Sequence, residues 1–210
     1  MAHEGDSGAT APGSCRVVVA GPARFDVVRD AVFLTGSGPS LEKRPAEARR
    51  LESIVFRNHP AFTALYDGHT LALAYDRRAL ATAARAVERT WAEAFGEGFV
   101  TGHRGALLYL TKYFTPHPPG EPHFFVKPWA FTLTPPGWSS LIEGFHGDGY
   151  DVMRGVISTD VFHATPAVFH VRREGSAIRV GDGAPLLRVL PIPRRLLAAG
   201  FRTVALPDAL

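Results

Sequence analysis

The sequence of 210 residues has a single cysteine, Cys15, so it cannot form an internal disulfide. Disulfides are rare in reducing compartments, which predicts a cytoplasmic protein, with Cys15 as a small side chain opening an apolar run. No apolar stretch reaches the length of a membrane span. Residues 1–14 lack the basic and apolar regions of a signal peptide, and their small polar composition predicts a disordered tail.

The sequence also lacks any long block of like charge. Its 23 basic and 20 acidic residues are spread along the chain, and the short basic segments 44–50 and 193–197 are interpreted as solvated faces. Nucleic-acid binding normally needs a basic stripe with interleaved aromatic residues, so we expect no nucleic-acid partner. Neither a GxGxxG motif nor a P-loop is present, and helices do not alternate with strands, which argues against a Rossmann-type fold.

The first half of the chain mixes strand and helix signals. Short apolar runs that end in glycine predict strands at 15–21 and 30–36. Helix-favouring residues predict a helix within 41–56, starting near its proline. A Tyr-Asp-Gly turn between apolar runs predicts strand, turn and strand over 58–76. The alanine-rich segment 77–96, with apolar residues on one stripe and a terminal glycine, predicts the clearest helix.

After Gly96 the pattern changes to short apolar or alternating segments about ten residues apart, separated by glycine and proline turns. This spacing is typical of a sandwich, barrel or jelly roll. We therefore predict a single α+β domain over 15–210. A helix-containing N-terminal half would pack on a mainly antiparallel β-sandwich or jelly-roll-like C-terminal half, with the β-rich part at about 97–195.

Four segments of this half resemble a bacterial and phage protein family of unknown function. They are FGEGFVTGH (95–103), WAFTLTPPGWSSLIEG (129–144), GVISTD (155–160) and VGDGAPLLRVLPI (180–192), and the resemblance covers about residues 58–195. It implies a β-rich fold and no known chemistry. The TPPGW segment has the composition of a rigid turn, and we expect Asp160, at the end of GVISTD, to cap a turn.

A fainter resemblance concerns the β-clip fold of dUTPases and dCTP deaminases, which show a similar order of a proline-glycine turn, a GVI segment and a late glycine. The phosphate-binding GRSS-type motif of those enzymes is missing, because WSSLIEG has the two serines without the preceding arginine. This resemblance therefore implies something about fold and nothing about activity.

The β-rich half is also rich in histidine, and this is the main hint of chemistry. The histidines concerned are His117, His123, His146, His163 and His170. A two-histidine, one-carboxylate set holds non-haem iron in jelly-roll enzymes, which makes His146, Asp148 and His170 candidate ligands for a divalent metal such as iron. Arg179, nine residues after His170, resembles the substrate-binding arginine of 2-oxoglutarate oxygenases. However, only 21 residues separate Asp148 from His170, which is short for that fold.

The same residues could work without a metal. His146 with Asp148 or Asp151 forms a candidate acid–base pair, since imidazole titrates near neutral pH. Arg172 or Arg179 would then bind a substrate carboxylate. The glycine-rich loop 143–154 would line the mouth of a pocket in the β-rich half.

Two aromatic residues, Tyr150 and Trp138, complete the candidate substrate site. Two functions remain open. The first is an enzyme of specialised metabolism that acts on a small organic molecule, as a metal-dependent oxygenase or as an acid–base catalyst. The second is a non-catalytic β-sandwich module for ligand binding or assembly, with a homo-oligomer as an option and no membrane partner.

Overall fold

The structure is a computed structural model, and the expected tail, residues 1–14, and His117 lie outside the part that it describes. The described residues are 15–19, 23–34, 47–102, 112–116 and 120–198.

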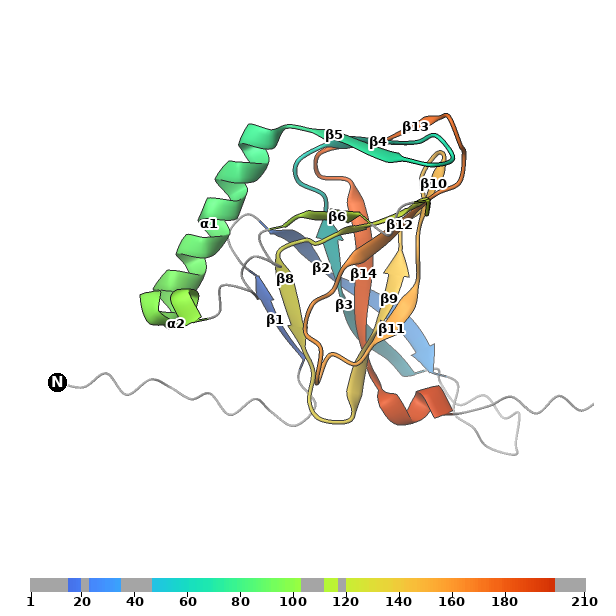
Figure 1. Cartoon of the computed structure of the whole chain (residues 1–210). Coiled ribbons are helices and arrows are strands. Elements are labelled where there is room, and N and C mark those ends of the chain that lie inside the picture. Colours follow the sequence, from blue (N-terminus) through green and yellow to red (C-terminus); the bar gives the residue numbers. More distant parts are fainter. Residues whose placement is uncertain (1–14, 20–22, 35–46, 103–111, 117–119, 199–210) are drawn as a thin grey trace, which may run out of the picture.

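Most of the described chain is β-structure, with one long helix (Figure 1). The strands before the helix are β1 (Arg16–Val19), β2 (Arg24–Leu34), β3 (Glu47–Arg57), β4 (Phe62–Tyr66) and β5 (Leu71–Tyr75). Those after it are β6 (Phe114–Pro116), β7 (His123–Val126), β8 (Ala130–Leu133), β9 (Trp138–Gly144), β10 (Tyr150–Val152), β11 (Gly155–Ile157), β12 (Ala167–Val171), β13 (Ala177–Val180) and β14 (Pro185–Pro193).

All pairings among these strands are antiparallel, and they form four sheets. The largest sheet has five strands in the order β11-β9-β14-β3-β2. A four-stranded sheet follows the order β10-β12-β7-β6, and smaller sheets join β13-β4-β5 and β1-β8. The expected β-rich class of mixed α and β structure is thus confirmed at this coarse level.

The helix expected within 41–56 is wrong where the structure describes it, because residues 47–57 form strand β3. This strand lies between β2 and β14, so both of its edges are paired. Its Phe56 side chain is fully buried and Val55 is 5% exposed. Burial and pairing on both sides outweigh the modest helix preference of the Glu, Ala and Arg residues in this segment.

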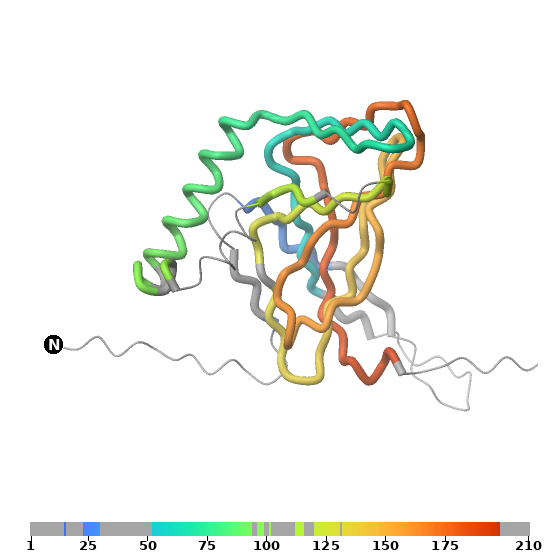
Figure 2. The backbone as a smooth tube through the Cα atoms, viewed as in Figure 1, coloured from blue at the N-terminus to red at the C-terminus, as the bar shows by residue number. Residues whose placement is uncertain are grey.

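This correction also changes the expected division of the chain. Strands β2 and β3 from the first half and β9, β11 and β14 from the second share the five-stranded sheet. Figure 2 shows these distant parts of the chain running through the same β body. The helix-containing N-terminal half therefore does not only pack on the β-rich half; its strands β2 and β3 supply part of the central sheet.

Helix α1 (Arg77–Phe95) confirms the helix expected at 77–96 and is followed by the short α2 (Glu97–Gly102). The Asp76 carboxylate caps its start by accepting hydrogen bonds from the backbone N–H groups of Arg78 and Ala79, both at 2.9 Å. Gly96 ends the helix with φ 85°, a value that glycine tolerates. No helix in the described part of the chain is long and apolar enough to cross a membrane.

Aromatic rings pack the four-stranded sheet against the three-stranded sheet. Phe62 of β4 meets Phe124 and Phe169 edge-on, with ring centroids 5.7 and 5.5 Å apart, and Phe124 and Phe169 are both fully buried. Side chains alternate between the two faces of a strand. The face of the four-stranded sheet opposite Phe124 and Phe169 therefore points outward, and this outward face carries the candidate site.

The TPPGW turn is held by Asp160, as expected for a turn-capping residue. The Asp160 carboxylate accepts the backbone N–H of Gly137 at 3.0 Å and forms an ion pair with Arg194. Arg194 lies in the 3-10 helix η1 (Arg194–Ala198) and also donates to the carbonyl of Trp138 at 3.2 Å. Three segments distant in sequence are thus joined by one carboxylate.

We expect Asp160→Asn to destabilise the protein at neutral pH and to have little effect in acid. The N–H of Gly137, followed by Arg194, holds the pKa of Asp160 below its usual value of 3.8. A lowered pKa in the folded state stabilises the protein above the unfolded-state pKa, and this contribution disappears as the pH falls through the folded-state pKa. Urea denaturation at pH 7 and at about pH 2, well below the unfolded-state pKa, measures the difference. Asp148→Asn, whose carboxylate is 92% exposed, is the control, and an equal loss at both pH values would contradict the assignment.

Candidate functional site

A row of polar side chains crosses the outward face of the four-stranded sheet. Asp151 of β10 lies directly opposite His170 of β12, which lies opposite His123 of β7. Directly opposed residues of an antiparallel pair project from the same face, so the three side chains are neighbours. The imidazole rings of His123 and His170 are stacked, with centroids 4.7 Å apart.

At the end of this row, Asp151 is held between His146 and Arg172. Its Oδ1 is 2.9 Å from Nδ1 of His146, and its Oδ2 is 3.4 Å from Nε of Arg172. Arg172 also donates to the carbonyl of Gly147 at 2.8 Å. The Asp151 carboxylate is one-third exposed and the His146 side chain is 64% exposed, so the imidazole can reach a molecule from solvent.

A tight turn places His146 beside Asp151. Gly147 and Tyr150 exchange backbone hydrogen bonds, and Gly149 between them has φ 79°. A Cβ on Gly147 would lie 2.2 Å from the ring of Tyr150, so this position has no room for a side chain. The glycines of HGDGYD therefore shape the turn that folds the imidazole back over β10.

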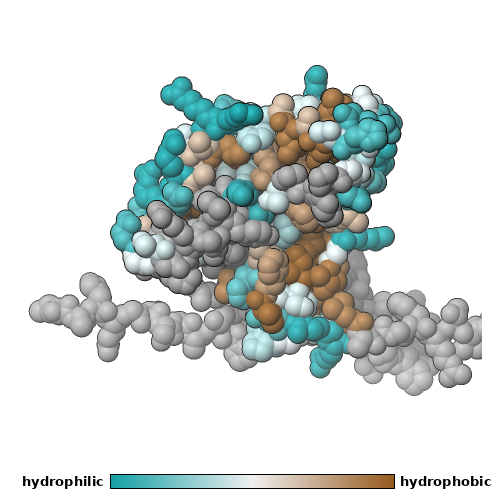
Figure 3. Space-filling view, in the orientation of Figure 1, coloured by the Kyte–Doolittle hydropathy of each residue, from teal (hydrophilic) through white to brown (hydrophobic). Residues whose placement is uncertain are grey.

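These groups border a depression of about 490 Å³ between the ends of β9, β10 and β12. Its lining residues are Glu143, Gly144, His146, Asp151, Val152, Met153, Arg154 and His170. In Figure 3 hydrophobic surface occupies the middle of the β body, and hydrophilic surface follows α1. The loop 143–154, expected at the mouth of a pocket, supplies most of this lining.

Two of the candidate site residues in the HGDGYD segment, Asp148 and Tyr150, do not line the depression. The Asp148 side chain is 92% exposed and is 3.5 Å from Arg173. Tyr150 is 8% exposed, packs against Phe169 with centroids 5.2 Å apart, and has its pKa raised by burial. Of the two carboxylates considered for His146, the structure brings Asp151 to it.

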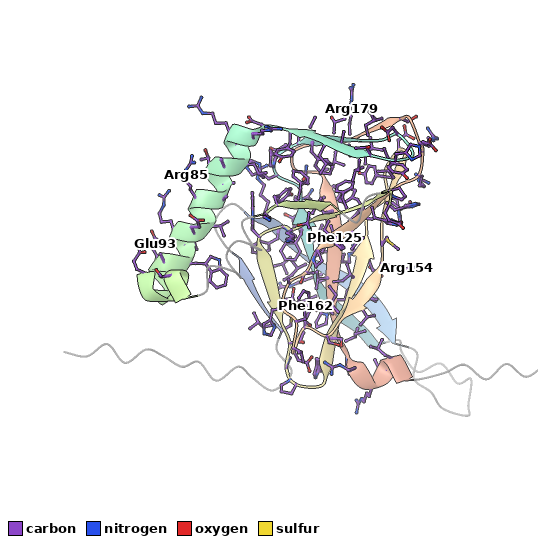
Figure 4. All side chains as sticks on the ribbon, viewed as in Figure 1. Arg85, Glu93, Phe125, Arg154, Phe162 and Arg179 are labelled. Atoms are coloured by element: carbon purple, nitrogen blue, oxygen red, sulfur yellow. The ribbon has the colours of Figure 1, made fainter. Side chains whose placement is uncertain are left out.

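Two other candidates lie elsewhere in the fold. Trp138 begins β9, whereas Glu143 and Gly144 at the other end of that strand line the depression, a separation of roughly 20 Å along a seven-residue strand. Arg179 lies in β13 opposite Thr63 of β4, in the three-stranded sheet. Figure 4 shows Arg179 at one end of the molecule, away from Arg154 beside the depression.

The three expected metal ligands, His146, Asp148 and His170, do not form a ligand set. Within the ranges that the structure describes, no group of three or more His, Cys, Asp or Glu side chains is arranged to hold a metal ion. Asp148 is turned toward Arg173, and the Asp151 carboxylate is already engaged by His146 and Arg172. The side chains present do not fit a non-haem iron centre.

Comparison with known proteins adds no relative. No protein-family model matches the chain, and neither a curated protein nor a solved structure shows a significant match. The resemblance to the TPPGW family and the fainter one to the β-clip fold therefore stay predictions, and the site has to be interpreted from its own geometry.

Sequence reasoning missed Arg154 and Met153, which line the depression together with His146 and Asp151. Met153 could have been predicted from its position two residues after Asp151, because side chains two residues apart in an extended segment lie on the same face. Arg154 has no such signal, since it lies in the two-residue connection between β10 and β11. Its position depends on how β11 pairs with β9.

A larger depression, of about 650 Å³, lies along α1 and is lined by Arg85, Glu88, Arg89, Ala92, Glu93 and Glu97. All but Glu97, the first residue of α2, belong to a single helix. Figure 4 shows Arg85 and Glu93 pointing away from the β body. Opposite charges at helical spacing are typical of a solvated helix surface, so this depression is not a candidate site.

Proposed function

We propose that the protein is an enzyme that acts on a small organic molecule by acid–base catalysis at His146. The observation that carries this proposal is the 2.9 Å contact between Nδ1 of His146 and Asp151. A carboxylate this close to Nδ1 favours the neutral tautomer that carries its proton there, and a small turn of the exposed imidazole would align the two groups in a hydrogen bond and leave Nε2 with a free lone pair. His146 would then remove a proton from the substrate through Nε2 and return it to the product.

The other polar groups support this role. Arg172 contacts the second oxygen of Asp151, which helps to orient the carboxylate toward the imidazole. His170 borders the same depression as a second imidazole that could donate or accept a hydrogen bond. A sandwich or jelly-roll-like arrangement of the sheets is part of this proposal, because such folds commonly hold their sites at an open rim.

The test compares two neighbouring carboxylates. A library of small organic acids, amides and esters is incubated with the wild type, and turnover is followed by mass spectrometry. For any substrate found, we expect His146→Gln and Asp151→Asn to lower kcat about 100-fold or more, the usual contribution of a positioned general base. Asp148→Asn, which changes an exposed carboxylate paired with Arg173, should leave kcat unchanged. Wild-type kcat in His146→Gln would contradict the proposal.

Exposed apolar side chains favour a second candidate, an assembly module. Val161 and Phe162 form an apolar loop tip with 76% and 51% exposure, and Val156 on the edge strand β11 is 42% exposed. Exposed apolar side chains at a loop tip and on an edge strand are groups that a protein contact can bury. Sedimentation velocity at several concentrations tests it. Concentration-dependent association that is lost in Phe162→Ser, without turnover in the library, would favour assembly over catalysis.

A further inference from the structure

We infer that the depression beside His146 takes a small monocarboxylic acid with an apolar body. This inference rests on the proposed site and names the class of molecule that it binds. Three features carry it: a guanidinium without a partner among the described residues, a carboxylate that offsets its charge, and an apolar strip next to the polar row.

The guanidinium belongs to Arg154. It lines the depression, is exposed, and has neither an ion pair nor a hydrogen-bond partner in the part of the chain that the structure describes. Arg172, the other arginine at this site, is engaged by Asp151 and by the carbonyl of Gly147. Arg154 is therefore the group available to an incoming anion, and guanidinium binds carboxylates through two parallel hydrogen bonds.

The carboxylates of the site limit the charge of that anion. Asp151 is balanced by Arg172 and by its contact with His146, whereas Glu143 lines the depression without an ion-pair partner among the described residues. A second negative charge on the ligand would be attracted by Arg154 and repelled by Glu143, so it would add little to binding. One exposed guanidinium beside a carboxylate thus suits a ligand with a single carboxylate, which fits the two parallel hydrogen bonds of Arg154.

An apolar strip lies beside the polar row on the same face. Met153 is 48% exposed, and its backbone N–H bonds to the carbonyl of Val168 at 2.8 Å, which continues the pairing of β10 with β12. Val168 lies opposite Phe125 of β7. By strand alternation Met153 and Val168 share the outward face with Asp151 and His170. The strip would contact the hydrocarbon part of an acid whose carboxylate binds Arg154.

The chain offers a direct probe of this strip, because Met1 and Met153 are its only methionines. Full-length protein labelled with [methyl-13C]methionine is titrated with benzoate, benzamide and phenyl phosphate, and the methyl signals are followed by NMR. We expect benzoate to shift the Met153 signal saturably, benzamide to bind about tenfold more weakly, and phenyl phosphate to bind no more tightly than benzoate. Arg154→Gln should weaken benzoate about tenfold, the equivalent of one charge-assisted contact, and leave benzamide unchanged.

Two control variants separate the inference from the proposed catalysis. Arg173→Gln removes an exposed arginine paired with Asp148 and should leave benzoate binding unchanged. His146→Gln should still bind benzoate, so a failure of acid–base catalysis would not be mistaken for a failure of binding. If none of the three ligands shifts the Met153 signal, both the inference and the proposed site would be overturned. Equal affinity for benzamide, or tighter binding of phenyl phosphate, would overturn the carboxylate assignment alone.

Discussion

Replacing Asn58 with alanine is expected to lower the free energy of unfolding by about 4 kcal/mol, because it leaves several buried polar groups without partners. Asn58 is fully buried, and its Nδ2 donates to the carbonyls of Pro60 and Gly181, both at 2.9 Å. Its Oδ1 accepts the hydroxyl of Tyr113 at 2.9 Å. The backbone of Asn58 also bonds to Gly183 and Ala184, so this residue ties the end of β3 to the turn before β14.

Chemical denaturation of Asn58→Ala, with Tyr113→Phe as the matched variant, measures this effect. Tyr113→Phe removes only the hydroxyl from the same network and should cost about 1–2 kcal/mol. The double variant should be less destabilised than the sum of the two single variants, since both remove the Tyr113–Asn58 hydrogen bond. A loss below about 1 kcal/mol in Asn58→Ala would show that the network does not hold these segments together.

Local sequence patterns predicted the elements that local forces determine. The helix at 77–96 is marked by its alanine content, apolar stripe and terminal glycine, and the structure buries Val87 of that stripe and ends the helix at Gly96. The hairpin expected within 58–76 is also present as β4 and β5. Each of these signals lies within one short segment, so it can be recognised without knowing which distant segment packs against it.

Strand β3 shows why the rest could not be predicted in the same way. Its residues favour helix slightly on their own, and only pairing with β2 and β14 makes the extended form more stable. The partner strand β14 begins 128 residues after the end of β3, from Arg57 to Pro185, so no local pattern contains this information. The helix expected within 41–56 was wrong for this reason.

The candidate site was also predicted only in part, because it too depends on contacts that a local sequence pattern does not contain. The sequence indicated His146, Asp151, Arg172 and His170, and the structure brings all four together. The sequence could not decide between Asp148 and Asp151, because composition does not determine which way each side chain projects from the glycine-rich segment HGDGYD. Asp151 lies on a strand opposite His170, whereas Asp148 lies in the turn and contacts Arg173.

Two of the segments that suggested a family resemblance, TPPGW and GVISTD, meet in the fold away from the depression. Gly137 of the TPPGW turn and Asp160 of GVISTD form a hydrogen bond, and Arg194 connects both to the end of β14. This contact is at the Trp138 end of β9, and the depression is at its Gly144 end. The resemblance therefore concerns the framework, and the proposed catalytic residues lie outside its motifs.

Gly144→Ala is expected to destabilise the protein by about 3 kcal/mol or more, because a methyl group at this position collides with backbone. An added Cβ would lie 1.9 Å from the carbonyl oxygen of Val152 and 2.7 Å from its Cβ. A side chain could rotate away, but the Val152 carbonyl is part of β10 and can move only if that strand shifts. Gly144 and Val152 both line the depression, so a shift of β10 would also displace Asp151 from His146.

Gly155→Ala is the matched control, since an added Cβ there meets nothing within 4 Å and the strand conformation suits alanine. Urea denaturation should give Gly155→Ala a stability within about 0.5 kcal/mol of the wild type. In any Gly144→Ala protein that folds, the Met153 methyl signal should move from its wild-type position and benzoate binding should weaken. Wild-type stability in Gly144→Ala would mean that β9 and β10 lie further apart than the structure places them. The dyad of His146 and Asp151 would then lose its physical basis, because the same approach of the two strands brings the imidazole over the carboxylate.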